Sequence, residues 1–111
     1  MKPKRKPVKE PHLTENLEKM FKKGITLVDF NAPWCAPCRV QKPIVDQLAG
    51  QYRGKARVLV LDVDEHRKAA MRLCITSIPT LIIFKNGREM WRFVGLQPAE
   101  VISTAIEKVM G

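Results

Sequence analysis

Residues 27–38 read LVDFNAPWCAPC and join an apolar run to two cysteines three positions apart, Cys35 and Cys38. The β-branched and apolar residues at 25–30 are typical of a strand. From Ala36 onward, hydrophobic side chains recur at helical spacing and predict one buried helix face, made of Val40, Ile44, Val45, Leu48 and Tyr52. The two cysteines therefore lie where a strand gives way to a helix.

Two cysteines at this spacing fit three kinds of site: a redox-active dithiol, half of a zinc site, or two thiols with no special chemistry. A metal site needs further ligands, and the chain has no second CxxC and no closely spaced Cys–His pair. The remaining candidate ligands, His12, His66 and Cys74, are scattered. We expect no metal, and because no nucleotide-binding loop is present we expect no bound cofactor either.

The other expected elements follow from periodicity and turn signals: helices over 13–23, 65–73 and from Pro98 onward, and strands over 57–64, 80–84 and 90–94. Asn86-Gly87 between the last two strands predicts a hairpin. The nearly continuous apolar run at 57–64 predicts a central strand covered on both faces. Early strands that alternate with helices favour parallel pairing, so we expect an α/β fold with a central mixed sheet, helices on both faces and a C-terminal hairpin plus helix.

The chain of 111 residues is long enough for one domain, and its net charge of +9 is unevenly spread. Residues 1–9 carry five basic side chains and no acid. We expect a disordered basic tail over 1–11 and one domain over 12–111. The tail has no aromatic residue on which bases could stack, so a nucleic-acid partner is not favoured.

The cysteine count and the apolar runs indicate where the protein works. Three cysteines cannot all be paired, as they would be in a secreted disulfide framework. The basic N-terminus is followed by no apolar stretch of the kind found in secretory signals, and the longest uncharged run is too short to cross a bilayer. We therefore expect a cytoplasmic protein without membrane contact, in which a CxxC pair is more often catalytic or metal-binding than a structural disulfide.

The position of the two thiols suggests different roles for them. Cys35 precedes the helix, so its sulfur faces unpaired N–H groups and the positive end of the helix dipole, which stabilise a thiolate. Cys38 lies within the first turn and can close a disulfide with Cys35. We expect Cys35 to attack and Cys38 to resolve, with Pro37 stiffening the short ring between them.

Asp29 is anomalous, because it stands in a strand that is otherwise apolar. Burial of a carboxylate raises its pKa. We expect Asp29 to lie below the dithiol and to take the proton from Cys38 as that thiol attacks a mixed disulfide. The alternative is that Asp29 lies at a strand end and meets solvent.

These motifs together resemble the thioredoxin family. The resemblance rests on LVDFNAPWCAPC, on the helix that contains Pro43, on SIPTLIIFKNG at 77–87 and on Gly95, and it extends from about Leu13 to the C-terminus. It implies a thioredoxin fold and a protein-disulfide reductase that cycles between the dithiol and disulfide forms of Cys35 and Cys38. The implied partners are disulfide-containing client proteins and a thioredoxin reductase-type enzyme, with the protein itself a monomer.

The resemblance also implies a substrate-binding surface made of Trp34, Pro37, Ile78, Pro79 and Gly95. Pro79 would follow a cis peptide bond and pack against the dithiol, and the backbone of Ile78 would pair with a bound client chain. The isoleucine before this proline is similar to that of the reducing members of the family. The alternatives are a thioredoxin-fold interaction or scaffold module that uses the basic tail, and a disulfide isomerase or oxidase.

The chain departs from the family pattern at several positions. Asn31 stands in place of a tryptophan, Ala36 in place of a glycine, and Val60 in place of a lysine that neighbours the buried aspartate. The last change removes a cation from the surroundings of Asp29 and is expected to raise its pKa further. The family's first strand would fall near 8–12, where prolines oppose a strand.

Overall fold

The computed structural model describes residue 19 and residues 21–111. The expected basic tail over 1–11, the strand near 8–12 and most of the helix over 13–23 lie outside these residues. Residues 21–24 form a turn and a bend, so the helix expected to reach residue 23 ends before Phe21. Gly24, which follows, has a φ of +72°, a left-handed conformation that glycine adopts without strain.

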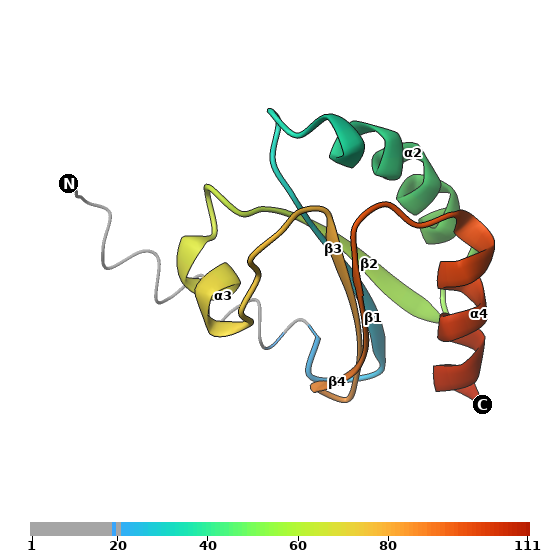
Figure 1. The fold of residues 1–111 in the computed structure, drawn as a ribbon. Helices are drawn as coiled ribbons and strands as arrows, with labels where there is room; N and C mark the ends of the chain where they lie inside the picture. The colour runs from blue at the N-terminus through green and yellow to red at the C-terminus, as the bar shows by residue number, and fades with distance from the viewer. Residues whose placement is uncertain (1–18, 20) are drawn as a thin grey trace.

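The described elements follow the expected order along the chain (Figure 1): β1 (Ile25–Asn31), α2 (Ala36–Gln51), β2 (Ala56–Asp62), α3 (Arg67–Arg72), β3 (Thr80–Lys85), β4 (Arg88–Val94) and α4 (Ala99–Met110). The strands form one sheet in the order β2-β1-β3-β4. β1 pairs in parallel with β2 and antiparallel with β3, and β3 pairs antiparallel with β4. The predicted mixed sheet and C-terminal hairpin are confirmed, and both residues of the Asn86-Gly87 turn have positive φ.

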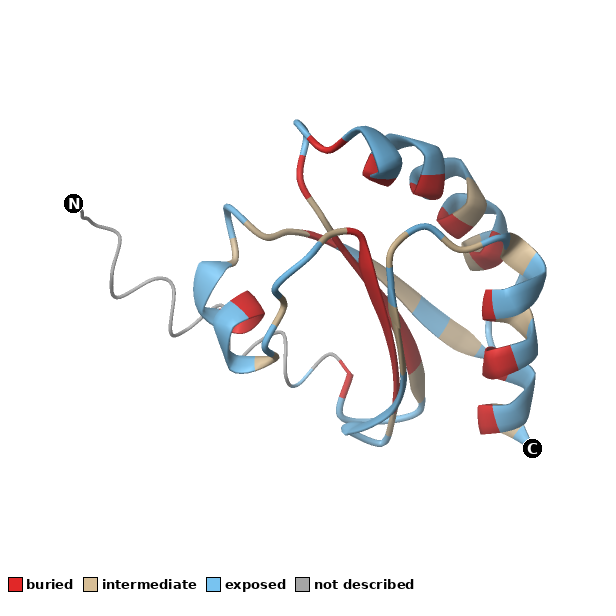
Figure 2. Cartoon of the chain, in the orientation of Figure 1, coloured by how far each residue is buried: buried red, intermediate tan, exposed pale blue. Residues whose placement is uncertain are grey.

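Helices cover both faces of the sheet, as expected. On one face, Leu27 and Leu81 pack with side chains of α2 and α4, among them Leu48 and Ile106. On the other face, a second cluster includes Ala69 of α3. Figure 2 shows the buried positions of α2 and α4 on the side of each helix that faces the sheet. The two clusters use alternate residues of β1, because successive side chains of a strand point to opposite faces.

Two expectations about individual elements need correction. In the sheet that the described residues form, β2 is an edge strand and not a central one, although its side chains pack on both faces: Val58 against the cluster of Leu27, and Leu61 in the cluster of Ala69. Its apolar run was compatible with either place, because periodicity does not show how many neighbours a strand has. On α2, Val40 is 54% exposed and Gln41 is buried in its place.

None of the helices in the described part of the chain combines the length and the apolarity that crossing a membrane requires.

Candidate active site: a cysteine pair at the start of α2

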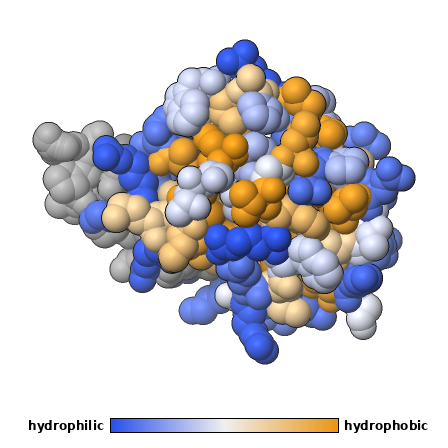
Figure 3. Space-filling model, in the orientation of Figure 1, coloured by the Kyte–Doolittle hydropathy of each residue, from blue (hydrophilic) through white to orange (hydrophobic). Residues whose placement is uncertain are grey.

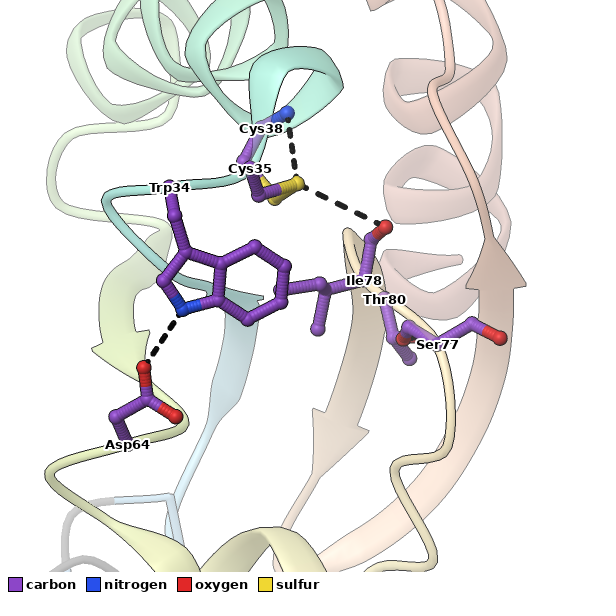
Figure 4. The surroundings of a disulfide bond; sticks show 7 residues. All are labelled: Trp34, Cys35, Cys38, Asp64, Ser77, Ile78 and Thr80. Atoms are coloured by element: carbon purple, nitrogen blue, oxygen red, sulfur yellow. Dashed lines mark hydrogen bonds between the residues drawn. A yellow bond between two sulfur atoms is a disulfide. The ribbon is translucent and has the colours of Figure 1, made fainter.

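Cys35 and Cys38 form a disulfide whose Cα atoms are 5.3 Å apart. Cys35 is the N-cap residue of α2. The backbone N–H of Cys38 donates to the Sγ of Cys35 at 3.3 Å (Figure 4). Pro37 lies in the first turn, where its missing N–H leaves no hydrogen bond unmade. Both cysteines are buried: Cys35 is 5% exposed and Cys38 is 2% exposed. The two thiols therefore differ in their position on the helix more than in their exposure.

The turn before β3 forms the opposite wall of the site. The Ile78–Pro79 peptide bond is cis. The carbonyl oxygen of Ile78 lies 3.8 Å from Cys35 Sγ, as Figure 4 shows. The N–H of Gly95, at the end of β4, donates to the carbonyl oxygen of Pro79 at 2.8 Å. Ile78 therefore lies against the disulfide, and the neighbouring Pro79 is hydrogen-bonded to Gly95 from a separate segment.

Trp34 adds an exposed aromatic surface next to Cys35. Its side chain is 66% exposed, and its indole Nε1–H donates to Asp64 Oδ2 at 2.8 Å. Asp64 follows β2 and was not singled out from the sequence, where no local pattern connects it with Trp34. Figure 3 shows hydrophobic side chains gathered across the upper half of this face of the molecule, where Figure 1 places the start of α2 and the upper end of β3.

Asp29 is fully buried below α2. It lies two residues after Leu27, which packs against α2 and α4, so the alternation of β1 directs Asp29 to the same side. Within the described residues, neither of its carboxylate oxygens has a hydrogen-bond partner. Loss of hydration on burial is the main reason why the pKa of Asp29 rises from 3.8 to about 6.

Two charged residues of α2 act on Asp29 in opposite directions. Lys42 lowers the pKa of Asp29 and Asp46 raises it, each by a smaller effect than burial. The two form an exposed ion pair with an N–O distance of 3.2 Å. Val60, which stands where the family has a lysine, is paired with Asp29 across the β1–β2 ladder. The position of Val60 carries no charge, and the cation that acts on Asp29 is Lys42 of α2.

Gln41 is a second buried polar residue of α2, and sequence reasoning missed it. Its side chain has no exposed surface and hydrogen-bonds to the backbone of Gln97. Hydrophobicity alone favours Val40 for the inner face, because glutamine is mostly exposed in proteins. The spacing of the buried positions, Cys38, Gln41, Val45 and Leu48, is three and four residues and would have identified Gln41 had the count started from Cys38.

The candidate metal ligands do not come together in the part of the chain that is described, where no group of three or more His, Cys, Asp or Glu side chains is close enough to hold an ion. His12 lies outside that part.

Cys74 is exposed and free, and it follows α3, which packs on the face of the sheet opposite α2. Arg92 Nη1 donates to its carbonyl oxygen at 3.5 Å. We expect Cys74→Ser to leave disulfide reduction unchanged, and mild peroxide to produce no covalent dimer of the wild-type protein. Non-reducing electrophoresis checks this; a dimer that forms in the wild type and is absent from Cys74→Ser would show instead that Cys74 is a redox-regulated thiol.

Comparisons with known proteins agree on the family. The family model described as thioredoxin matches residues 7–108. The thioredoxin of Staphylococcus saprophyticus is 46% identical over 93 residues, which cover 84% of this chain and 89% of that protein. A thioredoxin of Staphylococcus aureus is 46% identical over 85 residues, covering 77% and 82%. Among solved structures, a mutant thioredoxin from Halobacterium salinarum superposes with a TM-score of 0.79 at 32% identity, over 87% of this chain and 85% of that chain.

Proposed function

The chain belongs to the thioredoxin family and is a thiol–disulfide oxidoreductase that reduces protein disulfides; we propose that Cys35 is its attacking thiol, Cys38 its resolving thiol and Asp29 the group that accepts the proton of Cys38. The observation that carries the first assignment is the hydrogen bond from the Cys38 N–H to Cys35 Sγ at 3.3 Å. A helix N–H directed at a sulfur stabilises its thiolate, which is the nucleophilic form.

The proposed cycle begins with the reduced protein. The Cys35 thiolate attacks one sulfur of a client disulfide, and the other client sulfur leaves as a thiolate and takes up a proton. Cys38 then loses its proton to Asp29 and attacks the Cys35 sulfur of the mixed disulfide. The second client sulfur leaves as a thiolate and takes up the proton held by Asp29, and Cys35 and Cys38 are left as the disulfide seen here. The client gains two electrons and two protons: the protein supplies both electrons and the Cys38 proton, and solvent supplies the other proton, matching the one that Cys35 released when its thiolate formed.

Asp29 suits the second step because it is buried on the α2 side of β1 and its pKa of about 6 lies near neutral pH. A proton acceptor works best when its pKa is close to the working pH. Asp29 has no hydrogen-bond partner among the described side chains and backbone groups, so no existing bond must break when it takes a proton.

Client binding is proposed at the surface around the sulfurs. Trp34 and Pro37 border it on the α2 side, and Ile78, Pro79 and Gly95 border it on the opposite side. An extended client segment could pair with the backbone of Ile78 as an added strand, which would bring its disulfide to Cys35. We further propose that the protein works as a monomer in the cytoplasm and is returned to the dithiol form by an NADPH- or ferredoxin-linked thioredoxin reductase.

Reduction of insulin tests this function against the alternatives. In the presence of dithiothreitol, we expect the protein to accelerate the precipitation of insulin B chains, and its midpoint potential against glutathione to be near the family value of about −270 mV. A potential near about −180 mV, the value of protein disulfide isomerase, would contradict a reducing role and support isomerisation. Absence of any insulin reduction would favour a scaffold module.

A further inference from the structure

The amide of Gln41 connects the active-site helix to the loop between β4 and α4. Its Nε2 donates to the carbonyl oxygen of Gln97 at 3.0 Å, and the Gln97 N–H donates to its Oε1 at 2.8 Å. Both polar groups of the fully buried Gln41 side chain therefore hydrogen-bond to the backbone of one residue, Gln97. We call this pair of hydrogen bonds the Gln41 clasp.

The loop held by the clasp is also tied to the opposite wall of the site. Gly95, two residues before Gln97, donates its N–H to the carbonyl oxygen of Pro79 at 2.8 Å. The preceding carbonyl, that of Ile78, lies 3.8 Å from Cys35 Sγ. A closed path of contacts thus runs from the sulfur through the Pro79 turn and the loop to Gln41, and back along α2 to the cysteines.

Hydrophobic side chains are exposed at the start of the same loop. Val94, the last residue of β4, and Leu96 of the loop flank Gly95 and are 60% and 45% exposed. Side chains this exposed bury too little surface to hold the loop in place. Hydrogen bonds made by the loop backbone must do so, and the Gln41 clasp lies next to Leu96 in the sequence.

A buried glutamine lowers the stability of the fold unless its amide is hydrogen-bonded, because burial removes the amide from water and the lost hydrogen bonds must be replaced. An apolar side chain would fill the same place on the inner face of α2, between Cys38 and Val45, as its neighbours do. The glutamine at position 41 is therefore better explained by its hydrogen bonds to the loop than by the packing of the core.

We infer that Gln41 is a positioning residue for protein substrates: its amide holds the loop of Gly95 and Leu96 at a set place relative to Cys35, so that a client meets a preformed surface. The inference rests on the proposed function and adds to it. A small disulfide needs access to Cys35 alone, whereas a protein disulfide must also dock on the loop. Loss of the clasp is therefore expected to weaken the reaction with proteins selectively.

The test compares insulin with the small aromatic disulfide 5,5′-dithiobis(2-nitrobenzoate). Single turnovers of the reduced protein measure the half-saturating concentration and the limiting rate for insulin, and the second-order rate constant for the small disulfide. For Gln41→Met, which keeps the length of the side chain and removes its hydrogen bonds, we expect the half-saturating insulin concentration to rise about 5- to 10-fold, the effect of losing a hydrogen-bonded pair. The limiting rate and the reaction with the small disulfide should stay within about twofold of wild type.

Two control variants separate positioning from general stability. Gln97→Ala keeps both hydrogen bonds of the clasp, because Gln97 takes part through its backbone, and should behave as wild type. Tyr52→Phe removes hydrogen bonds from the Tyr52 hydroxyl to Ser103 and Glu107, which join the end of α2 to α4 away from the cysteines. It should lower stability and leave the half-saturating insulin concentration unchanged.

The outcomes are distinguishable. The inference is overturned if the half-saturating insulin concentration of Gln41→Met equals that of the wild type. It is also overturned if Gln41→Met loses activity with insulin and with the small disulfide by the same factor. If circular dichroism shows that Gln41→Met does not fold, Gln41→Asn, whose amide is one methylene shorter, is measured in its place with the same expectation. Failure of the wild-type protein to reduce insulin would overturn the proposed function itself and not this inference alone.

Discussion

Cys35→Ser is expected to lower the rate of insulin reduction at least roughly 1000-fold, the scale of effect seen when a nucleophile is removed from an enzyme. A serine hydroxyl at the N-cap of α2 can still accept the Cys38 N–H, so the helix start and the fold should be retained. The remaining thiol, Cys38, lies within the first turn of the helix and not at the N-cap, so it lacks the position that directs a helix N–H at the Cys35 sulfur and is expected to attack client disulfides poorly.

Cys38→Ser is the matched variant and should fail at a different step. Attack by Cys35 remains possible while release is lost, so client proteins should accumulate as mixed disulfides with this variant. Gel electrophoresis without reductant, followed by treatment with dithiothreitol, detects them. In the reduced wild-type protein, alkylation at neutral pH should label Cys35 before Cys38, and the opposite order, or trapping by Cys35→Ser in place of Cys38→Ser, would reverse the two roles.

Asp29→Ala is expected to stabilise the protein and to slow its release step. The pKa of Asp29 is about 6 in the folded protein against 3.8 for the free group. Between these values the unfolded chain has released the proton while the folded protein still holds it, so the free energy of unfolding falls as the pH rises from about 4 to 6. Above pH 6 Asp29 is charged in both states, and the folded protein is destabilised by the full difference between the two pKa values. A difference of about two pKa units corresponds to about 3 kcal/mol.

The alanine variant removes this penalty and loses a little packing. We expect its free energy of unfolding to exceed that of the wild type by about 2 kcal/mol at pH 8 and to approach it below pH 4. Urea unfolding at both pH values measures the difference. Release of the client from the mixed disulfide should become about 100-fold slower, the contribution typical of a positioned proton acceptor.

Thr26→Val provides a control for burial without charge. Thr26 is fully buried on β1, and its hydroxyl has no hydrogen-bond partner in the described part of the chain. Its replacement by a side chain of the same shape should stabilise the protein by about 1 kcal/mol at every pH and leave the release step unchanged. An Asp29→Ala variant that is less stable than the wild type and fully active would contradict the role proposed for Asp29.

The order of the described elements, the hairpin and the place of the cysteines could be predicted because each depends on residues close together in the chain. Asn86-Gly87 accommodates positive φ at both positions, and that local property suffices to define the turn. Cys35 and Cys38 both belong to the start of α2, so the spacing of three residues alone brought their sulfurs together. The motif at 27–38, read together with the order of the later elements and the segment at 77–87, was therefore enough to predict the fold class and the chemistry.

Contacts between distant segments depended on the tertiary structure. Trp34 and Asp64, Gly95 and Pro79, and Gln41 and Gln97 are pairs that no periodicity joins, because the two members of each pair belong to different elements. The same reason explains the errors at Val40 and in β2: hydrophobicity shows that a side chain can be buried, and the packing of neighbours decides whether it is. The pKa of Asp29 likewise depends on the helix folded over it, since burial and the charges of Lys42 and Asp46 arise only when α2 packs on β1.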